Sequence, residues 1–173
     1  MYKLQSLRNL IESAVPSLKI NPENLIVMAT DGKAVSTIGG GLSFEYGYTV
    51  AITVLDYSGH TDALFVPVLA WVRVHQSDLL ANPQSQARGI EFTVEPLNTA
   101  AVDIGIRVPV TERAVVKAVA DHPTRFNVEH PREPCHPGGQ CLPEHWELWL
   151  QDTKLAEWDL PLPPERARFL DLF

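Results

Sequence analysis

Two cysteines and several histidines lie close together in the last third of the chain. Cys135, His136 and Cys141 surround a Gly-Gly pair, and His145 follows four residues after the second cysteine. Thiolate and imidazole are the ligands of structural zinc sites, but those sites usually repeat short pairs such as C-x2-C. The C-x5-C spacing followed by x3-H departs from that pattern. The four residues are therefore metal candidates only, a disulfide is a further alternative, and ordinary loop residues are the favoured interpretation.

A second group of titratable residues, Asp56, His60 and Asp62, lies between an expected strand and an expected helix. Three such side chains suggest acid–base chemistry, but Asp-Tyr-Ser-Gly is typical of a turn, and a carboxylate in a first helical turn favours the positive helix end. The chain has no G-x-S-x-G or H-E-x-x-H motif, and neither cysteine lies in a recognisable nucleophile setting. We therefore predict no catalytic residues, no cofactor and no enzyme.

The charge and length of the chain limit its possible partners. The 173 residues suit one domain with an appendage, and the net charge is −7 with a pI near 5.3. Phosphate binding requires clustered Lys and Arg, so we do not expect nucleic acid as a direct ligand. No stretch reaches the roughly 18 apolar residues of a membrane span, and the first residues do not resemble a secretory signal. We expect a cytoplasmic protein that does not bind membranes.

Residues 42–75 predict a long strand, a short turn and an apolar helix. Alternate positions of the strand are apolar, namely Leu42, Phe44, Tyr46, Tyr48, Val50, Ile52 and Val54. About 14 residues at ~3.3 Å each reach about 45 Å, which predicts a strand that projects beyond a compact core and needs a partner. The alternative is a long strand in a curved sheet with a bulge at Gly47.

The expected helix follows Thr61, which is a candidate N-cap. Pro67 lies beyond the first turn, so either the helix kinks there or its regular part begins later. Phe65, Leu69 and their neighbours make the helix apolar nearly all round, which predicts burial on two sides. One of those sides is a candidate subunit contact.

Other segments complete an α+β fold, mostly an antiparallel sheet with flanking helices. We expect a helix over residues 4–15, a hairpin of 25–28 with 34–38 closed by an Asp-Gly turn, two antiparallel strands over 90–95 and 102–110, and a further strand over 114–119. Residues 77–88 look like a loop. Together, residues 1–120 are expected to form the main domain.

Residues 121–173 are expected to form an irregular extension, either separate from the main domain or part of it. Repeated prolines break the chain over residues 121–145, where only 126–129 suggests a short strand. Residues 146–150 and 155–158 predict a small β-hairpin. Its Trp149 is a contact candidate, because aromatics at strand spacing more often form core or subunit contacts than a ligand cage. Phe169 and Phe173 lie in an apolar tail of the kind that docks on a partner.

Several strings in the sequence are specific enough to suggest a family. They are Leu42-Ser43-Phe44-Glu45-Tyr46, Val66-Pro67-Val68-Leu69-Ala70-Trp71, His75-Gln76, Asn82-Pro83, Val102-Asp103-Ile104 and Thr111-Glu112-Arg113. In order and spacing, from the N-terminus to about residue 116, the chain resembles the tail completion protein R family of temperate, contractile-tailed phages. The resemblance implies a late structural protein, and it implies no catalytic residues.

The resemblance also implies a location and partners. The expected protein finishes the head-proximal end of the tail as a terminator ring that stops tube and sheath growth and prepares head joining. Terminators of other phage tails form hexameric rings of sheet-and-helix subunits, and by analogy we expect the same here. Expected partners are the chain itself, the tube and sheath proteins and a head–tail connector or neck protein, met first in the host cytoplasm. A zinc-stabilised interaction module is the main alternative, and a lysis or entry hydrolase is less favoured.

Overall fold

The computed structural model describes residues 1–36, 41–81, 84, 89–120, 122–131 and 143–160. Its main feature is a five-stranded antiparallel sheet with the order β1-β2-β4-β3, in which β5 pairs with β4 beyond this path. The strands are β1 (Leu25–Ser36), β2 (Phe44–Tyr57), β3 (Glu91–Pro96), β4 (Val102–Val119) and β5 (His122–Glu129). The chain is thus an α+β protein with a mostly antiparallel sheet, as the sequence predicted.

The predicted hairpin closed by Asp31 and Gly32 is wrong. Residues 25–36 form the single strand β1, and both of its halves pair with β2. The register shifts between Thr30 and Lys33, where Asp31 has φ of 55°. One residue in the left-handed region produces a bulge as readily as it produces a turn, and only the partner strand decides between them.

The apolar alternation of β2 defines the core face of the sheet. Tyr48, Val50, Ile52 and Val54 are buried and lie opposite the buried apolar residues of β4. Strand β4 continues without a break through both segments that the sequence divided into the strands 102–110 and 114–119. At 18 residues it is the longest strand, and every other strand of the main sheet except β1 pairs with it.

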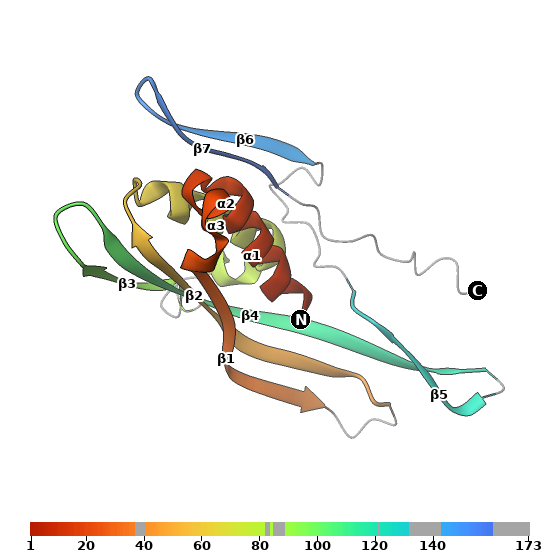
Figure 1. Ribbon diagram of the computed structural model, residues 1–173. Helices are drawn as coiled ribbons and strands as arrows, with labels where there is room; N and C mark the ends of the chain where they lie inside the picture. Colours follow the sequence, from red (N-terminus) through yellow and green to blue (C-terminus); the bar gives the residue numbers. More distant parts are fainter. Residues whose placement is uncertain (37–40, 82–83, 85–88, 121, 132–142, 161–173) are drawn as a thin grey trace.

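Three helices cover the core face of this sheet (Figure 1). They are α1 (Tyr2–Ala14), α2 (Pro16–Ile20), which has its proline at the favourable first position, and α3 (Asp62–His75). Short 3-10 helices span Pro22–Asn24 and Ser77–Leu80. Helix α3 continues through Pro67, which is buried, so of the two alternatives that the sequence left open, the later start of the helix is wrong. None of these helices has the length and apolar character needed to cross a membrane.

A small hairpin forms a third layer on the helices, on the side away from the sheet (Figure 1). It consists of β6 (Glu144–Leu150) and β7 (Thr153–Leu160), as the alternation of its residues predicted. Ala156, Trp158 and Leu160 on its inner face are buried, and β7 contacts α1 and α3. The hairpin therefore closes the core on the helix side.

The sheet is longer than the helical layer (Figure 1). The end of β1, the start of β2, the end of β4 and all of β5 extend past the helices, as the length of the predicted strand suggested. We call the part of this extension made of β5 and residues 113–119 the arm. Its inner face continues the core face of the sheet, because Phe44 lies opposite the buried Ala114.

Candidate functional site

A buried carboxylate anchors the start of helix α1 to the sheet. Glu112 of β4 is 5% exposed, and its two oxygens accept hydrogen bonds from the backbone N–H groups of Tyr2 (3.0 Å) and Lys3 (2.9 Å). The hydroxyl of Tyr48 also donates to Glu112. A carboxylate at a helix N-terminus satisfies donors that have no partner within the helix and interacts favourably with the helix dipole. Burial and this negative neighbour both raise the pKa of Tyr48, so its hydroxyl stays a donor.

A second buried polar group lies next to this anchor. The side chain of Gln76 accepts hydrogen bonds from Lys3 Nζ (2.7 Å) and from the backbone N–H of Thr111 (3.0 Å), and its amide donates to Asp78 (2.7 Å). The pair His75-Gln76 and the string Thr111-Glu112-Arg113 therefore meet in space. Residues from these two strings therefore connect α1, the end of α3 and β4 through hydrogen bonds.

Trp71 is at the centre of the helical layer. It is fully buried, its indole Nε1–H donates to Ser6 Oγ at 3.0 Å, and its ring stacks on His75 with 4.7 Å between centroids. The indole N–H thus has the partner that a buried Trp requires. Trp71 is a core residue that joins α1 to α3.

The contact candidates on β2 divide between surface and core. Phe44 and Tyr46 are partly exposed where the sheet extends past the helices. Their rings contact edge to face, with 4.7 Å between the ring centroids. Tyr48, two residues further along the same face, is 4% exposed and bonds Glu112. The expectation that Tyr48 lies at a contact surface is corrected, because the helices cover that part of the strand.

The contact candidates on α3 lie at the opposite end of the sheet. Leu69 is 45% exposed. Phe65 packs edge to face against Phe92 of β3, with 5.0 Å between the ring centroids. Phe92 and Val94 face the helix side but are 61% and 42% exposed, because β3 is an edge strand that the helices cover incompletely. Sequence reasoning did not single out this exposed pair. Their alternation gave the correct face, but it did not show where the helical layer ends.

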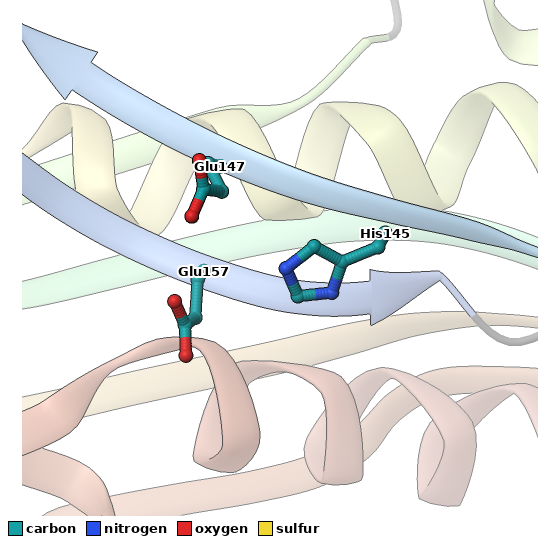
Figure 2. Close-up of side chains that lie close together, drawn as sticks. All are labelled: His145, Glu147 and Glu157. Carbon is teal, nitrogen blue, oxygen red and sulfur yellow. The ribbon is translucent and has the colours of Figure 1, made fainter.

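The outer face of the β6–β7 hairpin carries a titratable cluster (Figure 2). Ligand atoms of His145, Glu147 and Glu157 lie within 4.8 Å of one another, and all three side chains are exposed. Glu147 and Glu157 lie directly opposite each other in the ladder, which places two like charges together. Lys154 donates to both carboxylates, at 3.2 Å to Glu147, and so neutralises part of this charge. The cluster is an ion-pair network at the surface.

Each member of this network has a shifted pKa with an identifiable cause. The Asp159 carboxylate, 2.8 Å from Nδ1 of His145, raises the pKa of His145. Hydrogen bonds from Lys154 lower the pKa of Glu147 and of Glu157, and the same bonds raise the pKa of Lys154. The indole of Trp149 donates to Glu147 at 3.2 Å and is 52% exposed.

The structure describes only one of the four zinc candidates, His145. Cys135, His136 and Cys141 lie outside the described residues, as do the contact candidates Phe169 and Phe173. His145 is described, and its closest neighbours are carboxylates. Sequence reasoning missed Glu147 and Glu157 as its neighbours. Period-two counting along the predicted hairpin places both glutamates on the outer face, but His145 was assigned to the preceding loop, whereas β6 begins at Glu144.

Asp56, His60 and Asp62 serve the turn before α3. Asp56 has φ of 51°, and its backbone N–H donates to the Asp103 carboxylate at 2.9 Å. The backbone N–H of Asp62 donates to Nδ1 of His60 at 3.2 Å, so His60 takes the capping role expected of Thr61, whose side chain makes no cap bond. The hydroxyl of Tyr57 donates to the carbonyl oxygen of His60, and burial raises the pKa of Tyr57 to about 12. These residues stabilise the turn.

The side chains described above join elements of one α+β fold, and apolar side chains are exposed at both ends of its main sheet. Comparison with known proteins identifies the class of protein to which this fold belongs. The profile of the P2 phage tail completion protein R (GpR) family matches residues 1–134. The chain is also 35% identical over 159 residues to Tail completion protein R of Escherichia phage P2, which covers 92% of this chain and 99% of that protein. No solved structure is significantly similar.

The chain therefore belongs to the P2 phage tail completion protein R family. It has a structural role in phage tail assembly, it is located in the virion tail, and it interacts with other tail components. The family strings now have physical roles. They contribute Glu112, Gln76 and Trp71 to the contacts that join α1, α3 and β4.

Proposed function

We propose that this protein completes the head-proximal end of a contractile tail as a terminator ring that caps the tube and sheath and prepares the tail for head joining. The observation that carries the proposal is similarity over nearly the whole chain to Tail completion protein R of phage P2. The ring is proposed to be a hexamer of this chain, which assembles in the host cytoplasm and contacts tube, sheath and neck proteins.

The distribution of exposed apolar side chains supports self-association. In a closed ring, each subunit contacts one neighbour through one face and the other neighbour through a different face. This chain exposes apolar residues at both ends of its main sheet, including Phe126 and Phe92. We further propose that residues 1–120 form the tail-completion domain and residues 121–173 its extension.

The test is deletion of the gene from an inducible phage, followed by electron microscopy of the lysate. The proposal expects headless tails of abnormal length or unsheathed tubes, with normal particles restored by the wild-type gene supplied in trans. Normal infectious particles from the deletion phage would contradict the proposal. Microscopy of the purified protein with isolated tail tubes then tests the ring directly, since a ring is expected at one end of each tube.

A further inference from the structure

We draw no further inference here: the strongest candidate, the side-chain cluster of His145, Glu147 and Glu157 on the outer face of the β6–β7 hairpin, is an exposed group whose carboxylates already bind Lys154, and nothing else in the part of the chain that the structure describes points to a ligand there.

Discussion

The buried carboxylate of Glu112 provides a sharp test of how this fold is held together. Its two oxygens receive the first two backbone N–H groups of α1 and the hydroxyl of Tyr48. Glu112→Gln keeps the size of the side chain but replaces one acceptor oxygen by an amide donor. In either orientation the new NH2 group faces the backbone N–H of Tyr2 or of Lys3.

The magnitude follows from what is lost. A buried donor left without an acceptor costs about 1–3 kcal/mol. Loss of the charge beside the helix N-terminus costs a further 0.3 to 1 kcal/mol, and up to about 2 kcal/mol in a partly buried site. We therefore expect Glu112→Gln to lower the free energy of unfolding by about 2–4 kcal/mol, a large part of the 5 to 15 kcal/mol typical of a domain.

Urea unfolding followed by far-ultraviolet circular dichroism measures this change. Tyr48→Phe is the matched control, because it removes one donor to Glu112 and leaves both backbone contacts in place. That control is expected to cost less than Glu112→Gln, about 1.5 kcal/mol, the lower end for one hydrogen bond to a charged group. If Glu112→Gln costs no more than Tyr48→Phe, the carboxylate does not anchor α1 as described, and the reasoning is refuted.

Three further predictions concern other parts of the molecule. Trp71→Ala is expected to lower the free energy of unfolding by ~3 kcal/mol or more, since the residue is fully buried and the substitution leaves a cavity; a stable variant in urea unfolding would show that the helices pack without it. Asp31→Val is expected to cost about 1–2 kcal/mol in the same assay, because a β-branched residue is strained at φ of 55°, whereas Asp31→Gly should change stability by less than about 0.5 kcal/mol. By NMR titration, the pKa of His145 is expected above its ordinary value of 6.5 and should fall in Asp159→Asn. Because the folded pKa is raised, the stabilisation by this ion pair is present below the unfolded pKa and lost as pH rises through the folded pKa; an unchanged titration in Asp159→Asn would contradict the pairing.

Alternation and composition predicted most of the elements because those signals are local. The apolar period of β2, the Trp hairpin and the helix before Pro16 all agree with the structure. The errors lie where one local sequence pattern is compatible with two structures. Asp31-Gly32 suits a turn or a bulge, and either Thr61 or His60 can accept the capping hydrogen bond at the start of α3.

The candidate surfaces were less predictable than the strands. Tyr46 and Tyr48 lie on one face of one strand, yet Tyr46 is partly exposed and Tyr48 is buried, since the helical layer ends between them. In the sequence, Phe92 belongs to a segment that alternates apolar and polar residues, as does any strand with one buried face. Its exposure depends on which strand is at the edge of the sheet, and strand order is decided by contacts between distant residues.

The sequence by itself determined the fold class, the core face of the long strands and the family, because periodicity and specific strings are properties of the linear chain. Only the tertiary structure decided which apolar residues are exposed in the part of the chain that it describes, and which carboxylate anchors α1. The physical reason is that exposure and pairing depend on residues far apart in sequence. Tyr2 and Glu112, 110 positions apart, form one hydrogen bond.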